Sequence, residues 1–409
     1  MKFAIIGKSL PHTLSPKIHT EYFNLDYIKK ELNEDMLSNF FVLNDFDGFN
    51  VTIPYKEKVI PFLDEVSTEA LKIGAVNTVV KKDGKYFGYN TDVFGLEYGL
   101  KELKVDLTNK TVLILGSGGT SKTATYLVKK FTDKVFVVSR KGSINYQNCY
   151  DIDAEVIINT TPIGMYPNDN ESPIDLTKFS NLKAVYDVIY NPLKTKLVLD
   201  AIKLGIPAKN GLNMLVAQAV KAKDIFLSKQ TDESEIKKVL NSLEKELTNI
   251  ILVGMPSSGK STIAKILSKK LNRAYIDTDE LVVKNQNLTI PEIFENFGEQ
   301  KFREFETTAL KDAISSFSKV IATGGGIVLK ENNRDLLKKN SFVVYLVRDI
   351  DKLSTKNRPL SKDKDTLLNM EKVRKPLYQE VADLVVDNNK DLESVDKEII
   401  TKYEENFSN

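Results

Sequence analysis

The segment Gly254-x-x-x-x-Gly259-Lys260-Ser261 constrains the fold of this chain more than any other stretch. An apolar run, 250–253, precedes it and a helix-forming run, 262–271, follows it, which is the order that a phosphate-binding loop requires. Backbone N–H groups and a helix N-terminus can then surround phosphate oxygens. The pattern predicts a nucleotide site in an α/β domain with a parallel sheet, and the flanking elements disfavour the alternative of a turn without a ligand.

The residues of this loop have distinct expected roles. Lys260 is expected to reach the β- and γ-phosphates, and the Ser261 hydroxyl is expected to bind Mg²⁺. The full set of expected nucleotide-binding residues in the loop is Gly254, Ser257, Ser258, Gly259, Lys260, Ser261 and Thr262.

Length and composition narrow the remaining choices. A chain of 409 residues exceeds one core of ordinary size, so two or three domains are expected. The formal net charge of +2 favours neither nucleic acid nor an anionic membrane as a partner. A single cysteine, Cys149, fits a reducing compartment, and no apolar run approaches the span of a bilayer, so we expect a cytoplasmic protein.

Four short segments in the first 100 residues gather hydroxyl, amide and charged side chains. Each alone has a simple structural explanation: Ser15 before Pro16 is typical of a helix N-cap, which we favour for that residue in isolation, and the others are typical of turns. The side chains concerned are Thr13, Ser15, Thr52, Lys56, Asn77 and Asp92.

In this order and at these spacings, the four segments resemble the substrate domain of shikimate dehydrogenase. The resemblance implies that Thr13 and Ser15 hold the shikimate carboxylate. It further implies that Thr52, Asn77 and Asp92 hold ring hydroxyls and that Lys56 and Asp92 form the catalytic pair. Loss of hydride from a secondary alcohol requires the hydroxyl proton to leave at the same centre, which a Lys–Asp pair can serve. Which of the two takes the proton stays open, because their titrations would be coupled.

The next segment, 110–123, predicts a buried strand, a glycine-rich turn and a helix, as in a dinucleotide-binding βα unit. Gly116 permits the tight turn and Gly118 lets the backbone approach a pyrophosphate, while Ser121 replaces the third glycine of the fingerprint. The following strand ends without an acidic residue and offers three side chains that suit a 2′-phosphate, so NADP is preferred over NAD. These side chains are Ser139, Arg140 and Lys141.

The same family resemblance extends to about residue 245, through N-T-T-P-I-G-M at 159–165 and D-x-x-Y-N-P at 187–192. It implies that Tyr190 and Gln218 lie by the substrate. The implied cofactor-binding residues are Gly116, Ser117, Gly118, Gly119, Thr120, Ser139, Arg140, Lys141, Asn159, Thr160, Gly211 and Met214. A charged segment, 231–247, has apolar residues at helical spacing and is expected to end this part of the chain without a separate linker.

Beyond the phosphate loop, the order of D-T-D at 277–279, F-R-x-x-E at 302–306, G-G-G at 324–326, R-P-L at 358–360 and R-x-P-L-Y at 374–378 resembles shikimate kinase. The resemblance implies ATP as phosphoryl donor, Asp277 near Mg²⁺, and Arg358 as a lid residue that closes on the phosphates. Asp277 taken alone fits a helix N-cap equally well. The implied shikimate-binding residues are Asp279, Arg303, Gly324, Gly325, Gly326 and Arg374, and the implied catalytic residues are Lys260, Asp279 and Arg358.

One departure from the kinase pattern concerns the segment 351–357. It is short and lacks the arginine that the family often places against adenine; Lys356 is a candidate substitute, so ATP affinity and lid closure are left open.

Together these observations predict an α/β protein with three parts. Residues 1–100, completed by a helix at about 212–245, would bind substrate, residues 101–211 would form a Rossmann NADP-binding domain, and residues 248–409 would form a P-loop kinase domain. The implied function is bifunctional: NADPH-dependent reduction of 3-dehydroshikimate and ATP-dependent phosphorylation of shikimate, in aromatic amino acid biosynthesis. Two alternatives stay open: a regulatory or scaffold protein in which one domain only binds its ligand, and a dehydrogenase that also takes quinate or NAD.

Overall fold

The computed structural model describes residues 1–11, 13–353 and 364–408. The chain divides into a first compact unit, Met1–Leu240, and a second that begins at Asn241. Each unit is described by itself below. Among the described residues, no helix combines the length and the apolar character needed to cross a membrane.

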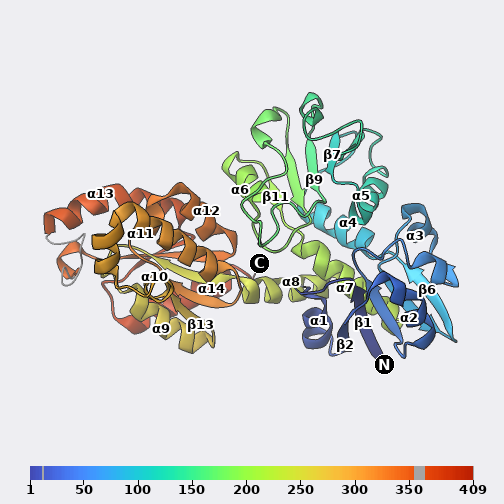
Figure 1. The fold of residues 1–409 in the computed structure, drawn as a ribbon, viewed down its shortest axis with the longest axis horizontal. Helices are drawn as coiled ribbons and strands as arrows, with labels where there is room; N and C mark the ends of the chain where they lie inside the picture. Colours follow the sequence, from blue (N-terminus) through green and yellow to red (C-terminus); the bar gives the residue numbers. More distant parts are fainter. Residues whose placement is uncertain (12, 354–363, 409) are drawn as a thin grey trace. The chain divides into compact units, whose positions relative to one another are not determined.

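The first unit begins with a mixed six-stranded sheet in the order β2-β1-β3-β5-β6-β4 (Figure 1). β1 pairs in parallel with β2 and β3, whereas β5 pairs antiparallel with both β3 and β6. The strands are β1 (Lys2–Gly7), β2 (Asp26–Glu31), β3 (Gly48–Val51), β4 (Glu65–Val66), β5 (Thr78–Lys82) and β6 (Lys85–Tyr89).

Short helical segments surround this sheet. They are α1 (Ser15–Lys17), a π-helical turn (Ile18–Tyr22), α2 (Leu37–Leu43), α3 (Thr68–Ile73), and 3-10 helices at Glu34–Met36 and Ile60–Phe62. The expectation that Ser15 caps a helix is wrong: the N-cap position of α1 is Leu14, and Ser15 is buried inside the first turn. Pro16 fixes that turn, since proline suits the first positions of a helix.

A second sheet in this unit is entirely parallel, in the order β11-β10-β9-β7-β8. Its strands are β7 (Val112–Leu115), β8 (Val135–Val138), β9 (Val156–Asn159), β10 (Ala184–Asp187) and β11 (Ala208–Lys209). The accompanying helices are α4 (Asp92–Glu102), α5 (Gly119–Val128), α6 (Lys196–Lys203), and 3-10 helices at Cys149–Asp151 and Leu176–Lys178.

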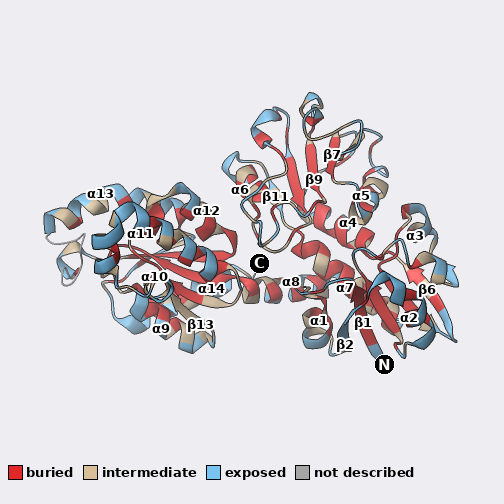
Figure 2. Ribbon diagram, in the orientation of Figure 1, coloured by how far each residue is buried: buried red, intermediate tan, exposed pale blue. Residues whose placement is uncertain are grey.

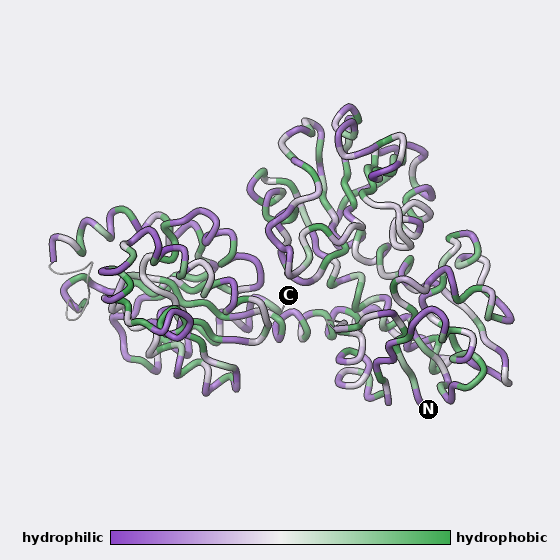
Figure 3. The backbone as a smooth tube through the Cα atoms, viewed as in Figure 1, coloured by the Kyte–Doolittle hydropathy of each residue, from purple (hydrophilic) through white to green (hydrophobic). Residues whose placement is uncertain are grey.

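The apolar strand sequences follow from burial of this sheet on both faces. Val112 and Ile114 pack among residues of α4 and α5, whereas Leu113 and Leu115 pack with α6 on the other face. Figure 2 shows these strands buried, and Figure 3 shows apolar residues concentrated along them. The sequence therefore places its hydrophobic runs where a parallel sheet needs them.

Two helices close the first unit and lead into the second. α7 (Leu212–Leu227) packs on α4, and α8 (Glu233–Leu247) contains the boundary between the units. In the last turn of α8, the carbonyl oxygen of Lys245 accepts a hydrogen bond from Arg273 (2.8 Å) and another from Tyr403, and that of Thr248 accepts one from Arg273 (2.7 Å). The C-terminus of α8 is thus capped by side chains of the second unit's own core.

The second unit is built on a parallel sheet in the order β13-β14-β12-β15-β16. Its strands are β12 (Asn249–Val253), β13 (Ala274–Asp277), β14 (Lys319–Ala322), β15 (Ser341–Val347) and β16 (Leu384–Asp387). Its helices are α9 (Lys260–Leu271), α10 (Thr278–Gln286), α11 (Ile290–Ile314), α12 (Glu331–Lys339), α13 (Lys364–Val381), α14 (Leu392–Glu405), and 3-10 helices at Ile327–Leu329 and Ile350–Lys352.

Alternate residues of β12 pack on opposite faces of this sheet. Ile250 and Leu252 contact the cluster that includes α9 and α14, whereas Ile251 and Val253 contact the cluster that includes α11, α12 and α13. The α/β fold with parallel sheets expected from the sequence is confirmed. β12 is the central strand of its sheet, and the phosphate-binding loop follows it directly.

Candidate active sites

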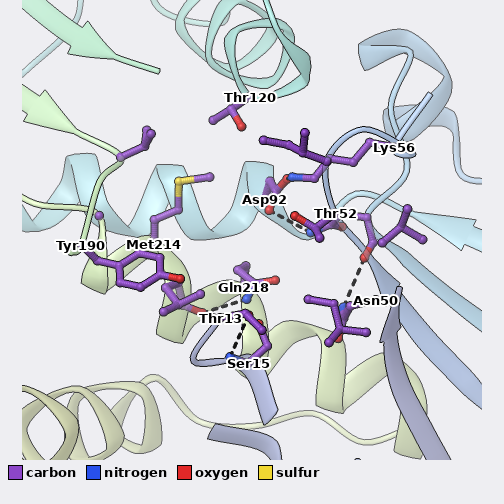
Figure 4. A pocket seen from close by; sticks show the side chains of 17 residues that line it. Thr13, Ser15, Asn50, Thr52, Lys56, Asp92, Thr120, Tyr190, Met214 and Gln218 are labelled. Atoms are coloured by element: carbon purple, nitrogen blue, oxygen red, sulfur yellow. Dashed lines mark hydrogen bonds and ion pairs between the residues drawn. The ribbon is translucent and has the colours of Figure 1, made fainter. Parts of the chain in front are cut away.

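A cavity of about 240 Å³ in the first unit collects every substrate-binding residue expected there (Figure 4). Its lining residues come from β1 and β3, from the segments that follow β1, β3 and β10, from the residue before β5, and from α4, α5 and α7. The expected residues that line it are Thr13, Ser15, Thr52, Lys56, Asn77, Asp92, Tyr190 and Gln218, together with Thr120, Gly211 and Met214 of the expected cofactor set.

Strand direction explains why Asn77 and Asp92 meet. β5 and β6 are antiparallel, with Thr78 paired to Tyr89, so the start of β5 and the end of β6 lie at the same edge. Asn77 immediately precedes β5, and Asp92 opens α4 shortly after β6. The β5–β6 hairpin therefore brings Asn77, just before the start of β5, close to Asp92, just after the end of β6.

Lys56 and Asp92 form a close ion pair at the floor of this cavity. Nζ of Lys56 lies 2.5 Å from Oδ2 of Asp92, and their side chains are 15% and 8% exposed, so solvent screens the pair little. Nδ2 of Asn77 donates to the other oxygen of Asp92 at 2.8 Å. The backbone N–H of Thr91 donates to Oδ1 of Asn77 at 2.7 Å, which fixes the amide orientation. The carboxylate is thus held from two sides.

The hydroxyl groups of Thr13 and Ser15 lie together at the opposite wall. Oγ1 of Thr13 donates to Oγ of Ser15 at 3.3 Å, and the Ser15 backbone N–H donates to Oγ1 of Thr13 at the same distance. Two neighbouring hydroxyls and no carboxylate make this wall suited to accept an anionic group.

Sequence reasoning left out Asn50, which also lines the cavity. Its Nδ2 donates to the carbonyl oxygen of Asn77 and to Oγ1 of Thr78, at 3.2 and 3.0 Å, and Tyr27 donates to its Oδ1 at 2.6 Å. Asn50 therefore supports the segment that carries Asn77. The signal was present, since Asn50 lies two residues before Thr52, which the sequence did mark. Val188 and Leu215, which line the cavity with apolar surface, had no such signal.

The glycine-rich turn after β7 stands beside this cavity. Gly116 has φ of 108°, and a Cβ there would lie 2.8 Å from Oγ1 of Thr160, so both conformation and packing require glycine. A Cβ on Gly118 would meet nothing within 4 Å, which leaves open space over the turn. A Cβ on Gly119 would lie 3.7 Å from Cδ of Lys56, so the turn and the ion pair adjoin.

Asn159 lies differently from its expected place beside a cofactor. Its side chain is fully buried, and its Nδ2 donates to Oδ1 of Asp187 at 3.0 Å while its Oδ1 accepts from Oγ1 of Thr161 at 2.7 Å. Asp187 also accepts from Oγ1 of Thr195 at 2.6 Å. Burial raises the pKa of Asp187 to about 7, although these hydrogen bonds oppose the shift. The Asn159 side chain thus ties together strand ends rather than facing the cavity.

Most of the other expected cofactor residues occupy exposed or partly exposed positions, whereas Gly211 and Met214 are buried. Arg140 and Lys141 lie at the tip of a turn after β8, closed by hydrogen bonds from the N–H groups of Ser139 and Gly142. A Cβ on Gly211 would lie 1.9 Å from the carbonyl oxygen of Val188, so this glycine is required by packing. Burial raises the pKa of Tyr190.

In the second unit, the loop from Gly254 to Lys260 has the conformation that its glycines predict. Gly254 and Gly259 have φ of 147° and 95°. Nζ of Lys260 donates to the carbonyl oxygens of Gly254 and Met255, at 2.9 and 2.8 Å. The lysine thus lies folded over its own loop, and Ser261 and Thr262 lie at the start of α9, where Ser261 is exposed.

Ser261 and Asp277 bring two oxygen atoms together beside this loop. Oγ of Ser261 donates to Oδ2 of Asp277 at 2.7 Å, while Oδ1 of Asp277 accepts from the backbone N–H of Asp279 at 2.9 Å. Asp277 is therefore both an N-cap of α10 and a neighbour of Ser261, so the two interpretations from the sequence are compatible. Such oxygen donors fit Mg²⁺. Within the described residues no three His, Cys, Asp or Glu side chains form a metal cluster.

The glycine turn after β14 lies among the other expected kinase residues. A Cβ on Gly324 would lie 2.5 Å from Asp279, one on Gly325 would lie 2.8 Å from Pro256 of the phosphate loop, and one on Gly326 would lie 2.1 Å from Arg303. Arg374 donates to the carbonyl oxygen of Gly325 at 3.1 Å. The acceptor-side residues and the phosphate loop therefore adjoin.

Arg303 is already paired with carboxylates. Its Nη1 lies 2.9 Å from Glu306 and its Nη2 lies 3.0 Å from Glu299. Burial lowers the pKa of Arg303, but the two carboxylates more than compensate and raise it above its ordinary value. Burial raises the pKa of Glu306, against the opposing effects of Arg303 and Arg374. Glu306 was not among the expected site residues, although its spacing of three from Arg303 on a helix signals the contact.

Two expected cations, Lys356 and Arg358, lie outside the described residues. The described part of the kinase site therefore comprises the phosphate loop, the Ser261–Asp277 pair and the glycine turn with its arginines.

Comparison with known proteins connects both sites to families. The family model described as the shikimate dehydrogenase substrate binding domain matches residues 5–79, and the model described as shikimate kinase matches residues 256–404. A shikimate dehydrogenase (NADP(+)) of Caldicellulosiruptor bescii is 39% identical over 278 residues, which span 60% of this chain and 96% of that protein.

Solved structures agree over the same part of the chain. Shikimate dehydrogenase 1 from Peptoclostridium difficile superposes with a TM-score of 0.56 and 34% identity, and covers 59% of this chain and 98% of its own. The enzyme of Thermus thermophilus, solved in complex with NADP(H) and shikimate, gives a TM-score of 0.52 and 28% identity, and covers 59% of this chain and 99% of its own.

Proposed function

The chain belongs to the shikimate dehydrogenase family and carries a shikimate kinase domain, and on this basis we propose which of its residues perform the two successive reactions. The first reaction is the NADPH-dependent reduction of 3-dehydroshikimate to shikimate. The second is the ATP-dependent phosphorylation of shikimate to shikimate 3-phosphate. The observation that carries the proposal is the cavity in which every substrate residue expected in the first unit lies around the Lys56–Asp92 pair.

In the reduction, bound NADPH would supply a hydride to the substrate carbonyl carbon. Thr13 and Ser15 bind the substrate carboxylate through their hydroxyls, while Thr52, Asn77 and Gln218 bind ring hydroxyls. Lys56 and Asp92 stabilise the charge that develops on the carbonyl oxygen and supply its proton, since their ion pair adjoins the glycine-rich turn. Nonpolar side chains such as Met214, Leu215 and Val188 exclude water from this wall.

The turn at Gly116–Thr120 and the start of α5 would hold the coenzyme, and Ser139, Arg140 and Lys141 would bind its 2′-phosphate. The open space over Gly118 and the exposed cations after β8 support this assignment. The same cations favour NADP over NAD, and the relative with bound NADP(H) supports this choice.

In the phosphorylation, the phosphate loop binds ATP, and Mg²⁺ bound near Ser261 and Asp277 would neutralise phosphate charge. Lys260 moves from its loop carbonyls to the transferred phosphoryl group, and Arg358 serves as the lid cation. Arg303 and Arg374 hold the shikimate carboxylate, and Asp279 orients the hydroxyl that accepts the phosphoryl group. Positioning and charge stabilisation are the main requirements of this chemistry.

The proposed domain limits are 1–100 with about 212–245 for substrate binding, 101–211 for NADP and 248–409 for the kinase. The unit boundary inside α8 and the separate sheets support them. A cytoplasmic location is supported by the single cysteine, Cys149, which is buried and unable to form an internal disulfide.

Product analysis tests the proposal. The purified protein is supplied with 3-dehydroshikimate, NADPH, ATP and Mg²⁺, and each of the last three is omitted in turn. We expect shikimate to accumulate without ATP and its phosphate to form only when ATP and Mg²⁺ are present. Shikimate that stays unphosphorylated with all components present would favour the alternative of a kinase-like domain that only binds its ligand.

A further inference from the structure

We propose that Arg348, which no motif marks, binds the phosphates of ATP from the β15 side of the phosphate loop. The inference rests on the proposed use of ATP by the second unit. Arg348 lies directly after β15, and the proposal makes no use of the segment 354–363.

Arg348 is placed at the carboxyl edge of the sheet, where ligands of parallel α/β folds bind. It directly follows β15, which pairs with β12 along the whole length of β12, with Val253 opposite Tyr345. A Cβ on Gly254 would lie 2.6 Å from the carbonyl oxygen of Leu346, so the first glycine of the loop packs on the end of β15.

The guanidinium of Arg348 lies close to the last glycine of the loop. A Cβ on Gly259 would lie 3.6 Å from its Nη1 and 2.5 Å from Nδ2 of Asn388. Asn388 donates to the carbonyl oxygen of Ser258 at 2.6 Å, and it follows β16, which pairs with β15. The loop is therefore flanked by Arg348 and Asn388 on the side of these two strands.

The cation of Arg348 has no counterion in the part of the chain that the structure describes. Its Nε is buried without a hydrogen-bond partner, and within residues 1–11, 13–353 and 364–408 it forms no ion pair. Asp349 is the next residue in the chain, and Asp387 lies opposite Val347 on the paired strand β16. Both of these carboxylates accept hydrogen bonds from Nδ2 of Asn389, at 3.0 and 2.7 Å.

An arginine that is partly withdrawn from water and has no carboxylate partner is unfavourable unless an anion binds it. The loop it adjoins is built to bring polyphosphate to this place. A guanidinium forms paired hydrogen bonds to phosphate oxygens, so Arg348 would act together with Lys260 but from another strand. This supplies a second cation for the nucleotide in a chain whose segment 351–357 lacks the arginine expected there.

Three variants of the full chain test the proposal: Arg348→Gln, Arg348→Lys, and Arg334→Gln as a matched control that removes an arginine paired with Glu380 on the same unit. Calorimetric titration measures ATP binding, and inorganic tripolyphosphate is tested as a competitor because it has phosphates and no base. We expect Arg348→Gln to weaken both ligands about tenfold, Arg348→Lys to recover most of the loss, and Arg334→Gln to change neither. Shikimate binding and the melting temperature should stay at the wild-type values.

Three results would overturn the proposal. One is unchanged ATP binding in Arg348→Gln. Another is weaker ATP binding with unchanged tripolyphosphate competition, which would assign Arg348 to the base. The last is a parallel loss of shikimate binding and melting temperature, which would make the residue structural. Failure of the proposed kinase function is distinguishable, because the wild-type protein would then form no shikimate phosphate with ATP and Mg²⁺, whatever Arg348→Gln does to ATP binding.

Discussion

The two active sites of this chain hold their charged groups in different ways. In the dehydrogenase site, Lys56 and Asp92 are paired with each other and braced by Asn77, inside a cavity whose remaining walls offer hydroxyls and apolar surface. In the kinase site, Lys260 is bonded to carbonyl oxygens of its own loop and Arg303 to Glu299 and Glu306.

The difference shows what each ligand must do on binding. In the proposed mechanism, a substrate of the dehydrogenase site meets a Lys56–Asp92 pair that is already formed, so little rearrangement is required. Ligands of the proposed kinase site would exchange partners with Lys260 and Arg303, so part of their binding energy would be used to break internal bonds. Removal of a group should therefore act mainly on rate in the first site and more on affinity in the second.

The largest effects are expected from the two lysines, each on its own site. Lys56→Ala should lower the reduction rate by about 10²–10⁴-fold, because it removes one member of the proton-transferring pair. Lys260→Ala should lower kcat/KM for phosphorylation by about 10²–10³-fold, through weaker ATP binding together with loss of charge stabilisation. Each variant is assayed for both reactions by steady-state kinetics.

Two exposed lysines serve as matched controls: Lys58→Ala in the first unit and Lys269→Ala on α9 should retain both activities. If either active-site variant abolished both reactions while keeping the wild-type melting temperature, the two sites could not be independent.

A smaller effect is expected from Arg303→Lys in the kinase site. Lysine retains the positive charge but loses the planar fork that can hold a carboxylate and Glu306 together, so KM for shikimate should rise about tenfold with a lesser change in kcat. Lys301→Ala on the same helix is the control, since Lys301 is exposed and pairs with Glu304. An unchanged KM would mean that Arg303 only supports the fold.

The smallest effect concerns the pH dependence of stability. Because burial raises the pKa of Asp187 to about 7, the folded chain keeps a proton that the unfolded chain, with an ordinary pKa of about 3.9, has released. Stability contributed by this group is therefore present below about pH 4 and is lost as pH rises toward 7. Asp187→Asn should flatten this decline.

The measurement is the melting temperature of the transition that NADP shifts, followed from pH 4 to pH 8. Asp133→Asn, a change at an exposed carboxylate of the same unit, is the control and should follow the wild-type curve. A variant curve for Asp187→Asn that is as steep as that of the wild type would assign the decline to other groups.

The fold was predictable where a backbone conformation or a degree of burial restricts the residue type. Gly254 and Gly259 have backbone conformations that glycine adopts without strain, and the runs at 112–115 and 250–253 are strands buried on both faces. The amphipathic pattern at 231–247 likewise marks α8, whose apolar residues are buried.

Other features depend on contacts that a sequence does not state. Gly211 lines the cavity, but it is packing against Val188 that requires glycine at this position. Ser15 resembles a cap because it precedes Pro16, yet the helix begins one residue earlier and the hydroxyl lines the cavity. Arg348 has no motif around it, and only the approach of β15 to the phosphate loop makes it notable.

The helix α8 has a consequence for the susceptibility of the protein to proteases in the cell. Proteases cut most readily at exposed, extended joints, whereas here the joint is a helix whose Ile236, Val239, Leu240, Leu243 and Leu247 are buried and whose last carbonyls are capped by Arg273 and Tyr403. The two enzymes should therefore resist separation by limited proteolysis. They would be made, retained and degraded together, in a fixed one-to-one ratio.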